Sequence, residues 1–155
     1  MEIIESKIIP GVKIINLKRF PDNRGFFSEI FRESKVSDSF KFPAQASYTE
    51  TYPGLIKAFH YHTSQTDYWI CLKGNIQVAL MDSWCSDLKT ETIFMGENNP
   101  KAIIIPPMVA HGYKVLGNEK IGLLYLTDRE YNSQKPDECR LPAHGNFYDW
   151  SCEDR

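Results

Sequence analysis

The sequence predicts an all-β protein, because apolar and polar residues alternate along much of its 155 residues and helical periodicity is almost absent. The alternation is clearest where Ile76, Val78 and Leu80 would face one side of a strand and the residues between them the other. Turn-forming groups that contain proline, glycine or asparagine separate the apolar runs. Many short strands joined by polar turns are typical of a β-sandwich or a barrel.

Strand-length runs follow one another along the chain. We expect strands over residues 12–17, 56–62, 68–72, 75–80, 90–95 and 121–127, and a further strand that starts at His111. Turns are expected at residues 10–11, 53–54, 73–75, 97–100 and 117–118. Only residues 32–40 carry a weak helical pattern. No linker or shift in composition divides the chain, so we expect residues 1–155 to form one domain.

The composition excludes several classes of protein. The chain has 18 Lys and Arg against 20 Asp and Glu, a net charge of −2, so there is no basic excess for nucleic acid and we expect no such partner. Its longest apolar stretch, residues 102–110, contains two prolines and is far shorter than the roughly 18 residues that a membrane span needs. The acidic start of the chain lacks the features of a secretory signal, so we expect a cytoplasmic protein. The scattered cysteines are expected to be reduced thiols: Cys71, Cys85, Cys139 and Cys152.

Two segments carry histidines within the strand pattern. His60 and His62 are two residues apart on one predicted strand, so both imidazoles should project from the same face. His111 follows an apolar run that ends in two prolines, at the start of another strand. A barrel with His-x-His on one strand and a later histidine after a proline-rich turn resembles the cupins, which are jelly-roll barrels. Gly54 and Asp67 also fit the spacing of the first cupin motif.

Four blocks of sequence occur in an order that narrows this resemblance. The first, Phe20 to Glu29, contains Arg24-Gly25-Phe26-Phe27, and the second places Gln45 fifteen residues before His60 in Lys57-Ala58-Phe59-His60-Tyr61. The third is Ile105-Pro106-Pro107-Met108-Val109-Ala110-His111-Gly112-Tyr113, and the fourth is the pair Tyr125 and Tyr131. Over residues 12 to 131 the chain resembles the RmlC-type dTDP-4-dehydrorhamnose 3,5-epimerases, a family of cupins.

The resemblance implies an isomerase that acts on a nucleoside-diphosphate 4-keto-6-deoxy sugar, with a dTDP-sugar as the expected form, in the biosynthesis of deoxysugars and cell-surface polysaccharide. It implies epimerisation at C3, C5 or both, no cofactor or bound metal, and a homodimer that exchanges its N-terminal strands. In this interpretation His60 and Tyr131 are catalytic. The implied substrate-binding residues are Arg24, Phe27 and Glu29 in the partner's nucleotide site, Gln45 at the base, Lys57 at a phosphate, and His62, His111 and Tyr125.

The chemistry suits these two catalytic side chains. A proton next to a ketone is acidic because the resulting negative charge spreads onto the ketone oxygen, so the site needs a base and a stabilising group at that oxygen. An unperturbed histidine has a pKa near 6.5, which makes His60 a suitable base. Tyr131, a phenol with an ordinary pKa of about 10, can return a proton from the opposite face of the ring and invert the carbon.

Two departures from the family pattern leave alternatives open. Asp67 stands where the family has an active-site lysine, and residues 140–145 lack the aspartate that orients the family's catalytic histidine. The set His60, His62, Asp67 and His111 instead matches the ligand pattern of metal-binding cupins, and such ligands suit Fe(II), Mn(II), Ni(II) or Zn(II). One alternative is therefore a metal-dependent cupin enzyme, and another is a non-catalytic binder of sugar nucleotides. The sequence leaves the nucleotide and the sugar open.

Overall fold

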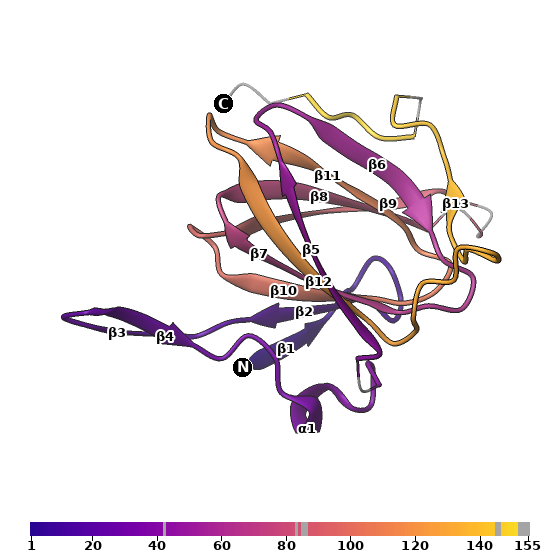
Figure 1. The fold of residues 1–155 in the computed structure, drawn as a ribbon. Helices are drawn as coiled ribbons and strands as arrows, with labels where there is room; N and C mark the ends of the chain where they lie inside the picture. The colour runs from indigo at the N-terminus through magenta and orange to yellow at the C-terminus, as the bar shows by residue number, and fades with distance from the viewer. Residues whose placement is uncertain (42, 83, 85–86, 145–146, 152–155) are drawn as a thin grey trace.

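The computed structural model describes residues 1–41, 43–82, 84, 87–144 and 147–151, and it places them in two facing antiparallel sheets with a short two-stranded arm (Figure 1). The first sheet runs in the order β1 (Glu2–Glu5), β2 (Lys13–Asn16), β10 (Lys101–Ile105), β7 (Asp67–Lys73), β12 (Ile121–Thr127) and β5 (Gln45–Thr51). The second has the order β13 (Cys139–Arg140), β6 (Ile56–Tyr61), β11 (Ala110–Leu116), β8 (Asn75–Asp82) and β9 (Lys89–Gly96). The all-β prediction is confirmed.

The main core fills the space between the two sheets. Ile76, Val78 and Leu80 of β8 are fully buried there, as the alternation predicted, and they pack in one cluster with Ile103 of β10 and Leu123 of β12. The intervening residues of β8 are buried as well, because Trp150 and its neighbours near the C-terminus cover the outer face of the second sheet. A strand covered on both faces loses its polar alternation, which explains the apolar character of β8.

Side chains near a short helix cover the outer face of the first sheet. The helix α1 (Glu33–Val36) has only four residues, so the weak helical pattern predicted over residues 32–40 extends too far. Val36 and Phe40 pack on Tyr68 and Ile104 from the outer face of β7 and β10. This covering explains the apolar run in β10, which is buried on both sides.

The predicted strands and turns are largely confirmed. Strands occupy all seven of the expected regions, with ends that differ by one or two residues. Glycines at four of the expected turns, Gly11, Gly54, Gly74 and Gly117, adopt positive φ angles that other residues rarely take. Six strands were not predicted: β1, β3, β4, β5, β10 and β13. Most of them are short or exposed, and β10 is a continuous apolar run without alternation.

The arm is a hairpin of β3 (Arg19–Asp22) and β4 (Gly25–Ser28) that extends away from the two sheets (Figure 1). Its three phenylalanines, Phe20, Phe26 and Phe27, are exposed, and the side chain of Phe27 keeps 68% of its surface accessible. Apolar side chains gathered on a projecting hairpin are typical of a surface that contacts another molecule.

Two further expectations concern the membrane and the thiols. Within the part of the chain that the structure describes, no helix has the length and apolar character that a membrane crossing requires. Cys71 and Cys139 are free thiols, as expected. Cys85 and Cys152 lie outside the described residues.

Candidate active site

Strand pairing between β6 and β11 brings two of the three predicted histidines together. His60 on β6 lies directly opposite His111 on β11, and their ring centroids are 4.2 Å apart. The close approach of these strands requires Gly112, because a Cβ there would lie 2.3 Å from the Cβ of Ala58. His62 follows at the end of β6 with its ring 5.3 Å from that of His60, so the two imidazoles share a face as predicted.

These side chains lie at one end of the space between the sheets, beside a cavity of about 1250 Å³. Six of the predicted site residues line it: Gln45, Lys57, His60, His62, Tyr125 and Tyr131. His111 lies behind His60 and is 1% exposed. The structure thus brings one candidate base and one candidate acid, His60 and Tyr131, to the same cavity.

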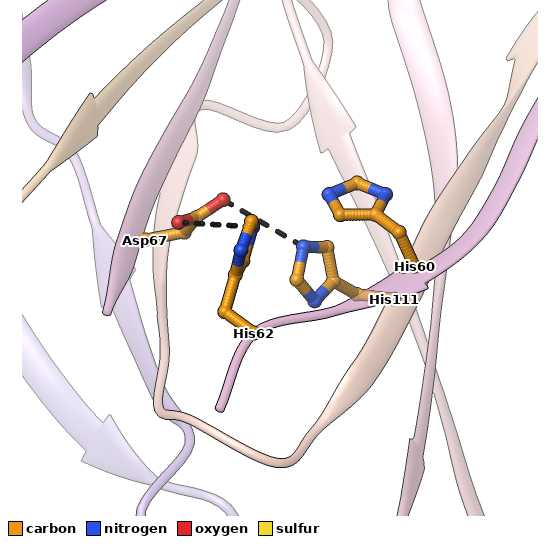
Figure 2. Close-up of side chains that lie close together, drawn as sticks. All are labelled: His60, His62, Asp67 and His111. Carbon is orange, nitrogen blue, oxygen red and sulfur yellow. Dashed lines mark ion pairs between the residues drawn. The ribbon is translucent and has the colours of Figure 1, made fainter. Parts of the chain in front are cut away.

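Asp67 is the carboxylate of the histidine cluster. It begins β7 on the opposite sheet, is 3% exposed, and points toward the histidines (Figure 2). Its oxygens lie 3.8 Å from Nε2 of His62 and 3.6 Å from Nε2 of His111. Two neutral donors hold it in place, since Gln65 donates to Oδ1 at 2.7 Å and Trp69 donates to Oδ2 at 3.0 Å.

Backbone carbonyls orient two of the three imidazoles. Nδ1 of His111 donates to the carbonyl of Val109 at 2.8 Å, and Nδ1 of His62 donates to the carbonyl of Asp137. Each ring therefore turns its Nε2 toward Asp67. Nε2 of His111 is buried and has no hydrogen-bond partner among the described residues. Its isolation matters, because a buried polar atom left unpaired costs about 1–3 kcal/mol.

Burial controls the electrostatics of the cluster. Burial, together with the neighbouring His111 and His62, lowers the pKa of His60 to about 3. Burial acts to raise the pKa of Asp67, but the proximity of His111 and His62 outweighs it and holds that pKa below its usual value. His60 is thus a neutral imidazole and Asp67 an ionised carboxylate at neutral pH.

The predicted nucleotide and acid groups line the same cavity. Gln45 accepts a hydrogen bond from the backbone N–H of Tyr131 at 2.9 Å, which ties the segment after β12 to the start of β5. The side chain of Tyr131 is 64% exposed and free to meet a ligand from the rim. Lys57 donates to Oγ1 of Thr49 at 3.1 Å, so its ammonium group is held at the cavity wall.

The remaining predicted residues, Arg24, Phe27 and Glu29, do not line this cavity. They belong to the arm and the segment that follows it, where Arg24 pairs with Asp22 and Glu29 pairs with Arg32. Figure 1 shows the arm directed away from the sheets of its own chain.

Three residues of the site were missed at the level of sequence. Gln65 and Trp69 hold Asp67, and the side chain of Asp137 fixes the turn after β6. The position of Gln65, two residues before Asp67, could have suggested a local contact. Nothing in the sequence around Asp137 indicated its place, because the contact joins residues more than 70 positions apart.

Two facing antiparallel sheets, with a neutral histidine, a carboxylate and a phenol around one cavity, are typical of a cupin-type enzyme. Comparison with protein families gives the finer assignment, because the model of the family described as dTDP-4-dehydrorhamnose 3,5-epimerase matches residues 6–150. The chain belongs to this family of sugar-nucleotide epimerases, and the resemblance inferred from its four sequence blocks is confirmed.

Curated relatives agree with this assignment. The spore coat polysaccharide biosynthesis protein SpsL of Bacillus subtilis is 41% identical over 155 residues, which cover 96% of this chain and all of SpsL. The probable low-salt glycan biosynthesis epimerase Agl13 of Haloferax volcanii is 34% identical, with 94% of this chain and 96% of Agl13 covered.

Solved structures share the fold. The dTDP-4-dehydrorhamnose 3,5-epimerase of Sulfolobus tokodaii superimposes with a TM-score of 0.83 at 25% identity, over 99% of this chain and 88% of that one. RmlC from Legionella pneumophila, solved with dTDP-4-keto-L-rhamnose, gives a TM-score of 0.79 at 22% identity, over 92% of this chain and 78% of that one. The predicted cupin jelly roll is thereby confirmed.

Proposed function

We propose that this protein epimerises a nucleoside-diphosphate 4-keto-6-deoxy sugar at C3, C5 or both, with His60 as the base and Tyr131 as the acid. The observation that carries the proposal is the presence of a neutral imidazole and an exposed phenol in one cavity, on segments that come from opposite sheets. Two groups are needed for inversion, because a single group that removes and returns the proton restores the original configuration.

The proposed reaction begins when Nε2 or Nδ1 of His60 removes the proton on the carbon next to the C4 ketone. The electron pair of that C–H bond moves into a carbon–carbon double bond, and the negative charge collects on the ketone oxygen. The hydroxyl of Tyr131 then gives its proton to the opposite face of the carbon. The ketone re-forms with inverted configuration, and solvent exchange returns His60 and Tyr131 to their starting states.

The nucleotide end of the substrate would lie along the wall that holds Gln45, Lys57 and Tyr125. Gln45 and Lys57 offer an amide for a base and a cation for a phosphate, respectively. Solved relatives support a dTDP-sugar as the ligand class, since RmlC of Legionella holds dTDP-4-keto-L-rhamnose and ChmJ of Streptomyces bikiniensis holds dTDP-quinovose. His62 would line the sugar end of the cavity, and His111 would support His60 from behind.

The proposed assembly is a homodimer in which the arm of each subunit reaches the other subunit's cavity. Support comes from the arm itself, which places Arg24 and Phe27 away from the cavity of their own chain and leaves its phenylalanines exposed. A surface polysaccharide or glycan is the expected destination of the product, because SpsL and Agl13 are named for such pathways.

Proton exchange in heavy water tests the chemistry directly. The protein is incubated with dTDP-4-keto-6-deoxyglucose in D₂O, and deuterium and configuration at C3 and C5 are read by mass spectrometry and NMR. The wild type should incorporate deuterium with inversion. His60→Gln should lower exchange by roughly 10²–10⁴-fold, the usual contribution of a general base.

Tyr131→Phe separates the two roles. With the acid removed but His60 intact, deuterium should still enter the sugar while inversion is lost by roughly 10²-fold or more. The controls are His144→Gln and Tyr52→Phe, because both side chains are exposed and neither lines the cavity. Full exchange in His60→Gln, or full inversion in Tyr131→Phe, would show that the two residues are wrongly assigned.

A further inference from the structure

Three proton-accepting groups converge in the buried end of the cluster. They are the carboxylate of Asp67 and the Nε2 atoms of His62 and His111, whose Nδ1 atoms already donate to backbone carbonyls. A neutral imidazole in this tautomer presents a lone pair at Nε2, and two lone pairs facing a carboxylate repel it. A positive charge between them would turn this repulsion into attraction.

The distances between these atoms fit ligands of one ion. Separations of 3.6 and 3.8 Å from the carboxylate to the two Nε2 atoms are too long for hydrogen bonds. Two ligand atoms that are each about 2.1 Å from one ion lie roughly 3.4 Å apart at a tetrahedral angle. The potential ligand atoms of His60, His62, Asp67 and His111 all lie within 4.8 Å of one another.

The surroundings of these side chains resemble the outer shell of a metal site. A histidine that binds a metal usually donates its other nitrogen to a carbonyl or carboxylate, and a ligating carboxylate is itself held by donors. Both conditions are met here, since Val109 and Asp137 hold the two rings while Gln65 and Trp69 hold Asp67. Nε2 of His111 is buried and has no hydrogen-bond partner among the described residues, as expected for an atom that binds a metal ion.

We propose that His62, Asp67 and His111 bind one divalent transition-metal ion. Two imidazoles and one carboxylate suit Zn(II), Fe(II), Mn(II), Co(II) or Ni(II) better than Ca(II) or Mg(II), which prefer oxygen ligands. The neutral amide of Gln65, now 3.2 Å from Nε2 of His62, gives up that contact when the ion binds and keeps its bond to Asp67.

His60 remains outside this set of three ligands. It forms no ion pair with Asp67, and among the described residues no hydrogen bond fixes either of its nitrogens, so its ring lacks the outer contact that the other two share. Figure 2 shows its ring set apart from the two dashed contacts. If the proposed function holds, the ion lies next to the base and supplies positive charge near the ketone oxygen. It would replace the active-site lysine of the family, whose position is occupied by Asp67 in this chain.

Metal binding is measured on the full-length protein without a histidine tag. The protein is treated with a chelator, dialysed, and titrated separately with Zn²⁺, Co²⁺, Mn²⁺ and Ni²⁺, and with Fe²⁺ under anaerobic conditions. Bound metal is counted by elemental analysis, and Co²⁺ is followed by its visible absorption. One ion per chain is expected, with a rise in the melting temperature, because a ligand that binds only the folded state stabilises it.

Variants then assign the ligands. His62→Gln, His111→Gln and Asp67→Asn should each weaken binding by roughly a hundredfold, a loss typical of damage to a metal site. Asp67→Asn keeps the shape of the side chain, so it tests the site even if a histidine variant fails to fold. His60→Gln and His144→Gln, the matched controls, should keep one ion per chain.

Several outcomes would overturn the proposal. Wild-type protein that binds no ion more tightly than Asp67→Asn would show that these residues do not bind a metal ion. Loss of the ion in His60→Gln would overturn the set of three ligands, and equal loss in His144→Gln would show non-specific binding. Metal content and proton exchange are separate measurements, so a bound ion without exchange removes only the proposed function, and exchange by metal-free protein with no affinity for any ion removes only the metal site.

Discussion

The backbone carbonyl of Asp137 accepts a hydrogen bond from Nδ1 of His62, and its side chain holds the turn that follows this histidine. The carboxylate accepts bonds from three backbone N–H groups, those of Thr63, Ser64 and Gln65, and from the hydroxyls of the first two. One residue from the segment before β13 therefore fixes both the ring of His62 and the chain beyond it.

Replacing Asp137 with asparagine should destabilise the fold. The amide nitrogen of asparagine cannot accept the bonds that one carboxylate oxygen now receives, so we expect a loss of about 1–2 kcal/mol in the free energy of unfolding at pH 7. Urea denaturation measures this loss. The matched control is Glu138→Gln, which removes only an exposed ion pair with Arg140 and should change stability little.

The same carboxylate predicts how stability depends on pH. Partial burial acts to raise the pKa of Asp137, but the bonds from Thr63 and Ser64 outweigh it and hold the pKa well below the usual range. A carboxylate with a lowered pKa stabilises the folded state above its unfolded pKa of about 3.9, and that contribution is lost as the pH falls below this value. The difference between wild type and Asp137→Asn should therefore shrink between pH 5 and pH 2. A constant difference across that range would contradict this assignment.

Gly112 determines the spacing of the strands that carry His60 and His111. A methyl group at this position would meet the Cβ and Cα of Ala58 at 2.3 and 2.6 Å and the carbonyl of Lys57 at 2.7 Å. Backbone atoms cannot move aside without separating β6 from β11. We therefore expect Gly112→Ala to cost about 1–3 kcal/mol or more in stability, the usual range for overpacking, and to reduce epimerase activity more than stability alone explains.

The control for this substitution is Gly117→Ala at the end of β11. Gly117 has φ of +79° but no heavy atom within 4 Å of the added methyl group, so only backbone strain should oppose the change. A loss of about 1 kcal/mol without any specific effect on activity is expected. Thermal unfolding and the proton-exchange assay compare the two variants, and equal effects on activity would argue against a special role for Gly112.

Trp69 supports Asp67 through one hydrogen bond, from its indole nitrogen to Oδ2 at 3.0 Å. Trp69→Phe keeps much of the aromatic packing against His60 and His111 but leaves that oxygen without its donor. Loss of such an outer contact typically weakens metal affinity by roughly 10–100-fold. Metal titration should show this loss, whereas Trp84→Phe, at an exposed position outside the cavity, should leave the affinity unchanged.

The sequence predicted the strands in which one face is buried and the residues alternate. It did not predict elements or side-chain roles that depend on contacts with residues far away in the sequence. The alternation in β8 and the His60–His62 pair follow from the geometry of a single strand, so both were accessible to local reasoning. The four-residue helix was overestimated because Val36 and Phe40 are apolar for a different reason, namely their packing on the outer face of the first sheet. Asp137 and Trp69 were missed for a related reason, since their roles depend on contacts that only the folded chain creates.

The last prediction concerns exchange of the arm between subunits, and it uses a mixed dimer. One chain carries Arg24→Ala in the arm and the other carries His60→Gln in the cavity, with different tags so that the mixed species can be purified. If each arm serves its partner's cavity, one site combines an intact His60 with an intact arm, and the other site carries both changes. The mixed dimer should then regain about half of the wild-type activity per dimer, whereas each variant alone stays weak, because the loss of a charged contact to substrate costs about 1.5–3 kcal/mol.

A second pair provides the control for this experiment. Tyr131 and His60 line one cavity within a single chain, so a mixed dimer of Tyr131→Phe and His60→Gln contains no intact site and should stay inactive in the inversion assay. If the first pair also stays inactive, each arm serves its own chain, and the exposed phenylalanines at the arm require another partner. Recovery in the second pair would show that Tyr131 of one chain acts with His60 of the other, which would contradict the assignment of both residues to one cavity of a single chain.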